Sequence, residues 1–123
     1  MTQMHAIEMC NQVDDEFEIV QEMFGEDFLE LADLFKRDTP KRMSDLDHAI
    51  KTLDIEKVKN LAHILGGSAC SMGAIKLSQL CKSLEEKSKA GGLEKFDDAL
   101  DAIRNEYHRI EAKLIKMTLS HPT

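Results

Sequence analysis

Apolar residues recur every three to four positions along most of the chain, which is the spacing of one face of an α-helix. The first stripe stops before Gly25 and predicts a short helix (Val13, Phe17, Val20 and Phe24). A second stripe begins near Glu26 and is interrupted at Pro40 (Phe28, Leu31, Phe35, Leu46, Ala49 and Leu53). Because Leu46 follows Phe35 by eleven residues, close to three helical turns, we favour one long helix kinked at the proline over two separate helices.

Three further stripes predict three more helices. The third follows Asp54, whose side chain suits an N-cap (Ile55, Val58, Ala62, Leu65, Ala69 and Met72). Gly73 supplies the turn to the fourth, which ends at Gly91-Gly92 (Leu77, Leu80, Cys81, Leu84 and Ser88). The last keeps a seven-residue repeat, typical of an antiparallel bundle or a coiled coil, and the short connections favour the bundle (Leu93, Phe96, Leu100, Ile103, Tyr107, Ile110, Leu114 and Met117).

These stripes predict an all-α protein, an antiparallel bundle of four main helices with a short additional N-terminal helix. Its 123 residues suit a single domain, residues 1–123, and a hydrophobic fraction of 42% is enough for one packed core. We expect frayed tails at residues 1–10 and 120–123.

Composition narrows the possible functions. A formal net charge of -7 argues against a nucleic-acid partner, which would require clustered lysine and arginine. The sequence contains neither a long apolar run nor a basic, apolar N-terminal signal, so we expect a cytoplasmic protein without membrane association. The three cysteines, an odd number without metal-binding spacing, predict no disulfide (Cys10, Cys70 and Cys81).

His63 is the residue that the third stripe leaves outside the core. At 100 degrees per residue it lies roughly 130 degrees from the centre of the apolar face, so we expect it to face solvent beside Asn60, Gly67 and Cys70. Gly66 and Gly67 each cost a helix about 1 kcal/mol relative to alanine. Either the helix ends at Gly66, or the glycines keep a surface clear; we favour a clearing where another protein's backbone can approach the imidazole.

The residues from His63 to Ala74 read His-Ile-Leu-Gly-Gly-Ser-Ala-Cys-Ser-Met-Gly-Ala and are followed by an apolar helix containing Glu85. This run resembles the signature of histidine-containing phosphotransfer (HPt) domains: a phospho-accepting histidine, a glycine and a small hydroxyl residue four and five positions later, and an apolar-Gly-Ala turn. The likeness covers roughly residues 28–85 and includes Asp38-Thr39-Pro40 upstream.

The resemblance implies an up-and-down four-helix bundle and a phosphocarrier in a multistep two-component phosphorelay. His63 would exchange a phosphoryl group with the aspartate of a receiver domain, through the ring nitrogen farther from the backbone, with support from Gly67 and Ser68. Gly66 departs from the family, which usually has Lys or Arg there, and this departure affects either transfer rate or partner choice. Lys59, one turn before His63, is our candidate for the missing cation.

The docking surface is predicted to include residues that flank His63 on the helical wheel (Asn60, Gly66 and Cys70). The sequence has no P-loop, kinase glycine-rich loop or clustered carboxylates, so we expect no autonomous kinase activity and no cofactor of its own. The partner, the receiver domain of a hybrid sensor kinase or of a response regulator, would supply Mg²⁺ and most of the catalysis. We expect a monomer.

Two other functions compete with this one. The chain is alternatively a receiver-docking module that does not transfer phosphate because of Gly66, or a structural protein that oligomerises through the final heptad stripe.

Two pairs have a spacing seen in metal sites, Asp45 with His48 and His108 with Glu111, but a di-metal bundle needs two such motifs with inward-facing carboxylates. Both histidines are therefore expected on solvated faces.

Overall fold

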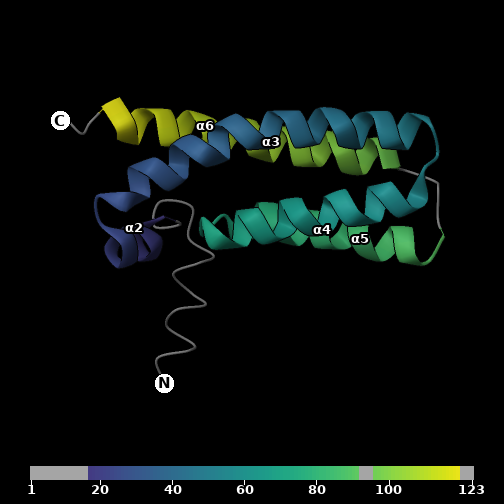
Figure 1. The fold of residues 1–123 in the computed structure, drawn as a ribbon, viewed down its shortest axis with the longest axis horizontal. Helices are drawn as coiled ribbons and strands as arrows, with labels where there is room; N and C mark the ends of the chain where they lie inside the picture. The colour runs from purple at the N-terminus through teal and green to yellow at the C-terminus, as the bar shows by residue number, and fades with distance from the viewer. Residues whose placement is uncertain (1–16, 92–95, 120–123) are drawn as a thin grey trace, which may run out of the picture.

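Five α-helices and no strand make up the residues that the structure, a computed structural model, describes: 17–91 and 96–119. The helices are α2 (Glu18–Phe24), α3 (Asp27–Lys51), α4 (Ile55–Ser71), α5 (Ile75–Lys89) and α6 (Phe96–Leu119). Figure 1 shows α3 to α6 running up and down beside one another, with short α2 at one end. This arrangement confirms the predicted four-helix bundle with an extra N-terminal helix.

Each long helix packs against two others, so the four form a closed ring: α3 contacts α4 and α6, and α5 contacts α4 and α6. The predicted stripes fill the centre, where the α6 residues Leu100 and Ile110 are buried. The heptad repeat of the last helix is therefore used inside this bundle, and its apolar face is not available to a second chain. Within the described ranges no helix is long and apolar enough to cross a membrane.

Leu53 corrects one expectation. It was expected in the apolar stripe of the second predicted helix, but α3 ends at Lys51 and Leu53 is 62% exposed, with a φ of 58°. The helix ends there because the next residue, Asp54, begins α4 as its N-cap, its side chain accepting a hydrogen bond from the backbone N–H of Lys57 at 3.2 Å. The prediction that Asp54 is an N-cap is confirmed. The predicted apolar positions Val13 and Leu93 and both predicted frayed tails lie outside the described residues.

Pro40 lies inside α3, which continues through it as one helix and bends along its length (Figure 1). A proline has no N–H, so the carbonyl four residues earlier, that of Lys36, loses its helical partner. The hydroxyl of Tyr107 in α6 lies 3.3 Å from this carbonyl and 3.4 Å from Oε2 of Glu111, so its one hydrogen is shared between the two acceptors. Tyr107 is buried and its ring packs on Phe35 at 5.8 Å between centroids. A side chain of another helix therefore satisfies the acceptor that the proline leaves open.

Replacing Tyr107 with Phe removes this donor but keeps the ring, and we expect a loss of about 1 kcal/mol of unfolding free energy. In a Pro40→Ala background the restored N–H of residue 40 can donate to the Lys36 carbonyl. Tyr107→Phe should then lower the unfolding free energy clearly less than it does in the wild-type background. Urea unfolding of the wild type, both single variants and the double variant measures this coupling. Equal costs in the two backgrounds would contradict the account.

Candidate functional site

The site is built on the hairpin of α4 and α5, which turns at Gly73 with a φ of 81°. α4 continues through Gly66 and Gly67 to Ser71, so the prediction that the helix continues is confirmed and the alternative that it ends at Gly66 is wrong. The two helices approach closely at Gly66, where an added Cβ would lie 3.4 Å from the Cβ of Cys81. Ser78 of α5 donates its hydroxyl to the Gly66 carbonyl at 3.0 Å, which ties the helices together.

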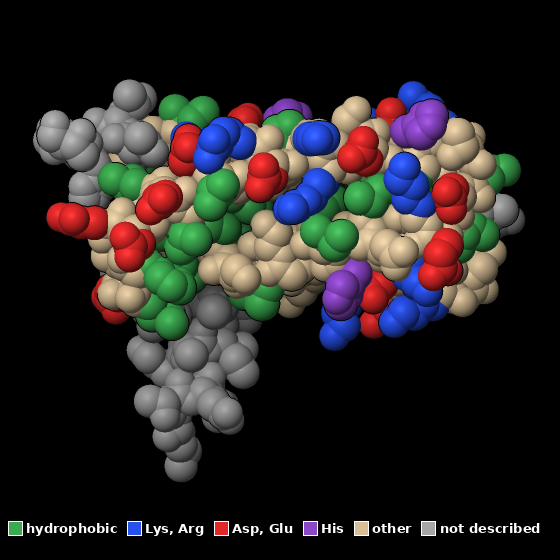
Figure 2. All heavy atoms as spheres, viewed as in Figure 1, with side chains coloured by type: hydrophobic (Ala, Val, Ile, Leu, Met, Phe, Trp, Pro, Cys, Tyr) green, Lys and Arg blue, Asp and Glu red, His purple; other side chains and the backbone are tan. Residues whose placement is uncertain are grey.

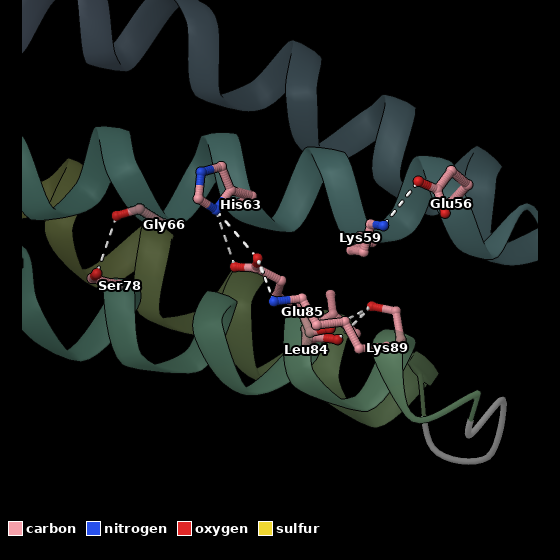
Figure 3. A network of polar contacts seen from close by, with 9 residues as sticks. Glu56, Lys59, His63, Gly66, Ser78, Leu84, Glu85 and Lys89 are labelled. Carbon is pink, nitrogen blue, oxygen red and sulfur yellow. Dashed lines mark hydrogen bonds and ion pairs between the residues drawn. The ribbon is translucent and has the colours of Figure 1, made fainter.

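His63 projects from α4 into solvent, and its side chain is 75% exposed. Its Nδ1 lies 3.2 Å from both carboxylate oxygens of Glu85, which comes from α5 (Figure 3). The other ring nitrogen, Nε2, points away from Glu85 in the same view. A neutral imidazole that donates its Nδ1 hydrogen to this carboxylate has its free lone pair on Nε2. The structure thus presents an oriented nucleophilic nitrogen to the outside.

Glu85 is held from both sides. Its side chain is only 17% exposed, and Lys89, one turn farther along α5, places its Nζ 3.5 Å from Oε2. Partial burial raises the pKa of Glu85, but the hydrogen bond from His63, the charge of its ring when protonated, and Lys89 together outweigh burial and bring the pKa below its ordinary value. The carboxylate is therefore ionised at neutral pH and is a fixed negative charge beside the imidazole.

An open groove of about 340 Å³ extends from His63 along the hairpin. It brings together four of the residues that the sequence singled out (His63, Gly66, Gly67 and Cys70), and α5 supplies the rest (Ser78, Lys82, Glu85, Glu86 and Lys89). Cys70 is exposed there, whereas Cys81 is buried behind the groove, and burial raises the pKa of its thiol to about 12.

The two glycines differ in what surrounds them. Gly66 faces α5, and its packing against Cys81 and Ser78 gives it a role inside the fold besides the one predicted in docking. Gly67 has no atom within 4 Å of where a Cβ would be, and it is exposed. The fold itself therefore does not require glycine at 67, and an alanine there would stabilise the helix by about 1 kcal/mol.

Other predicted site residues lie away from His63. Lys59 forms an ion pair with Glu56 at 2.8 Å and points away from the imidazole (Figure 3). Ser68 lines a separate hollow between α2, α3 and α4, together with Phe24 and Leu34. Asn60 is exposed on α4 but does not line the groove. The structure therefore does not bring Lys59 or Ser68 to the imidazole.

The sequence reading missed that Glu85, Lys82 and Lys89 lie in the groove with His63. Glu85 entered only as part of the family-like run, yet a geometric signal for it was present. In an antiparallel hairpin, residues nearly equidistant from the turn face each other; His63 lies ten residues before Gly73 and Glu85 twelve after it. The same reasoning places Ser78 and Cys81 opposite Gly66.

The remaining described histidines lie on solvated faces, as predicted. His48 is exposed, and His108 is exposed with its Nδ1 3.7 Å from Glu111. Across residues 17–91 and 96–119, no three His, Cys, Asp or Glu side chains are grouped so that they could hold a metal ion.

The face shown in Figure 2 is divided by chemistry. Hydrophobic side chains gather toward the end where α2 lies, and acidic and basic side chains alternate toward the other end. The exposed large apolar residues near the hairpin and α2 are Met23, Phe24, Leu34 and Ile64. Ile64 directly follows His63, so the polar groove and exposed apolar surface adjoin at the histidine.

Comparison with known proteins places these features in a family. Residues 30–113 match the family model described as the Hpt domain. The chain is 30% identical over 112 residues to histidine-containing phosphotransfer protein 2 of Arabidopsis thaliana, covering 85% of this chain and 72% of that protein. The crystal structure of histidine-containing phosphotransfer protein B (HptB) from Pseudomonas aeruginosa PAO1 superposes with a TM-score of 0.82 at 24% identity, covering 89% of this chain and 95% of that one.

The lowered pKa of Glu85 predicts a pH-dependent contribution to stability. A carboxylate whose pKa is lower in the folded than in the unfolded state stabilises the fold above the unfolded-state value, here 4.5, and loses that contribution as the pH falls through the folded-state value. We expect wild type to exceed Glu85→Gln in unfolding free energy at about pH 6, and this advantage to shrink toward about pH 3. Urea unfolding across this range measures it.

Glu86→Gln is the matched control, because it removes the same charge from the next position of α5 without touching the His63 pair. If the advantage of wild type over Glu85→Gln did not change with pH, the ion pair would not contribute to folding as described.

Proposed function

The chain belongs to the Hpt domain family, and from this we propose that His63 is the residue that carries the phosphoryl group. The protein is a histidine phosphotransfer protein of a phosphorelay. The observation that supports His63 is its geometry: an exposed imidazole fixed by a carboxylate through Nδ1, with Nε2 directed outward. The other described histidines, His48 and His108, lie outside the run from His63 to Ala74 that carries the signature.

The chemistry follows from this orientation. Nε2 attacks the phosphorus of a receiver's aspartyl phosphate, a bond forms between Nε2 and phosphorus, and the bond from phosphorus to the aspartyl oxygen breaks. The aspartate leaves as a carboxylate, and the ring, which keeps its Nδ1 hydrogen, becomes a positively charged phosphoimidazolium. Glu85 lies 3.2 Å from Nδ1 and stabilises this charge as it develops. No proton has to leave the ring in either direction.

The partners that we propose are receiver domains of hybrid sensor kinases or response regulators. In-line phosphoryl transfer needs cationic groups on the equatorial oxygens, usually including Mg²⁺. We assign the Mg²⁺ and most of the catalysis to the receiver, and treat this chain as a carrier without kinase activity. A cytoplasmic location and a monomeric state are part of the same proposal.

The test of the acceptor is transfer from a receiver domain of the same organism, phosphorylated with a small phosphodonor in the presence of Mg²⁺. Wild type should gain an acid-labile label and His63→Gln none. His108→Gln is the matched control, because His108 is also an exposed histidine beside a carboxylate. Label retained in His63→Gln would overturn the assignment, and binding without label in wild type would favour a docking module.

Gly67 provides a second test, because its cost to the helix has no explanation inside the fold. Gly67→Ala and Gly67→Gln should both raise the unfolding free energy, by up to about 1 kcal/mol. If the receiver's backbone approaches here, the longer side chain should slow transfer by about 10-fold or more, since a displacement of about 1 Å can cost more than that. More stable variants with unchanged transfer would show that the clearing has no role in docking.

A further inference from the structure

Cationic side chains near His63 are not equivalent. Lys59 is paired with Glu56 at 2.8 Å, and Lys89 is paired with Glu85 at 3.5 Å. Lys82 lines the groove from α5 and, among the described residues, forms no ion pair with either glutamate of its own face, Glu85 or Glu86. Lys82 is thus, among the described residues, the lysine of the groove that no carboxylate contacts within ion-pair distance.

The position of Lys82 matches the charge that α4 lacks. The groove is lined from α4 by His63, Gly66, Gly67 and Cys70, none of them a lysine or arginine, and Lys82 lines the same groove from α5. Lys82 is one helical turn before Glu85, the residue that contacts the imidazole. Gly66 adds no side chain to the floor of the groove, so a long, flexible lysine from α5 can extend over it toward Nε2.

Electrostatics favours a further cation in this groove. A phosphoryl group on Nε2 brings about two negative charges into a groove that already contains Glu85 and Glu86. Like charges at this range raise the energy of both the phosphorylated state and the transition state. A charge-assisted contact from an ammonium to the phosphoryl oxygens offsets this repulsion.

We propose that Lys82 binds the phosphoryl oxygens on phosphorylated His63, supplying from α5 the positive charge that Gly66 does not supply from α4. This inference rests on the proposed role of His63. It gives Gly66 a packing function that is compatible with transfer, so the departure at Gly66 does not by itself imply a module that only docks.

The variant that tests the proposal is Lys82→Ala, with Lys87→Ala as the matched control. Lys87 is an exposed lysine of the same helix, five residues on and about 140 degrees around it, and it does not line the groove. Single-turnover transfer from a saturating phosphorylated receiver should slow by about 10-fold or more in Lys82→Ala. The affinity for the unphosphorylated receiver should change less than 2-fold, as it should in Lys87→Ala.

A second measurement phosphorylates the protein without a receiver domain. Phosphoramidate can phosphorylate exposed histidines directly: its phosphorus–nitrogen bond breaks, ammonia leaves, and a bond from Nε2 to phosphorus forms. Labelling of His63 by this reagent should also slow in Lys82→Ala and be retained in Lys82→Arg. Adding Gly66→Lys to Lys82→Ala should restore most of the rate, because it returns the cation to α4.

The outcomes separate the two proposals. If wild type acquires no label on His63, the proposed acceptor fails. If wild type is labelled and Lys82→Ala behaves like Lys87→Ala in both assays, only the role of Lys82 is overturned. A loss of receiver affinity with an unchanged single-turnover rate would also overturn it, by making Lys82 a docking residue.

Discussion

The close approach of α4 and α5 at Gly66 is the constraint on which the site depends. A Cβ at that position would already be in van der Waals contact with the Cβ of Cys81 in α5, at 3.4 Å, and the Ser78 hydroxyl donates to the Gly66 carbonyl. This contact and the turn at Gly73 fix the register of the hairpin, which sets Glu85 beside the imidazole of His63. A nucleophile on one helix and its orienting carboxylate on the next are therefore positioned by backbone packing, which is stiffer than a loop.

Departures from helical propensity in this chain fall into two kinds. Pro40 opens a backbone acceptor in α3, and Tyr107 of α6 satisfies it, so this irregularity is compensated within the fold. Gly67 weakens α4, and no described atom of the chain occupies the space that it leaves. A helix cost that no internal contact explains is consistent with a requirement from outside the chain. The position of Gly67 beside His63, the proposed acceptor, fits a surface that a receiver approaches.

Charge at the site is divided between the helices. α4 contributes the exposed imidazole and almost no other polar group to the groove, whereas α5 contributes two glutamates and two lysines. One lysine, Lys89, pairs with the carboxylate that holds His63, whereas the other, Lys82, forms no ion pair within residues 17–91 and 96–119. In the proposed transfer, the phosphoryl group depends on α5 as much as on the helix that bears the histidine. Exposed apolar residues such as Ile64 border the same site.

The sequence by itself determined the helices, the bundle, the outward position of His63 and the family, because periodicity and a local motif record which face of each helix is buried. It also gave the Asp54 cap and the Gly73 turn. Tertiary structure alone decided which side chains of α5 meet those of α4, because that depends on hairpin register and interhelical distance. For this reason the sequence does not reveal that Glu85 and Lys82 lie beside His63, and it favours Lys59, which pairs with Glu56 in the structure. It also predicts Leu53 in the apolar stripe of the second helix, whereas α3 ends at Lys51.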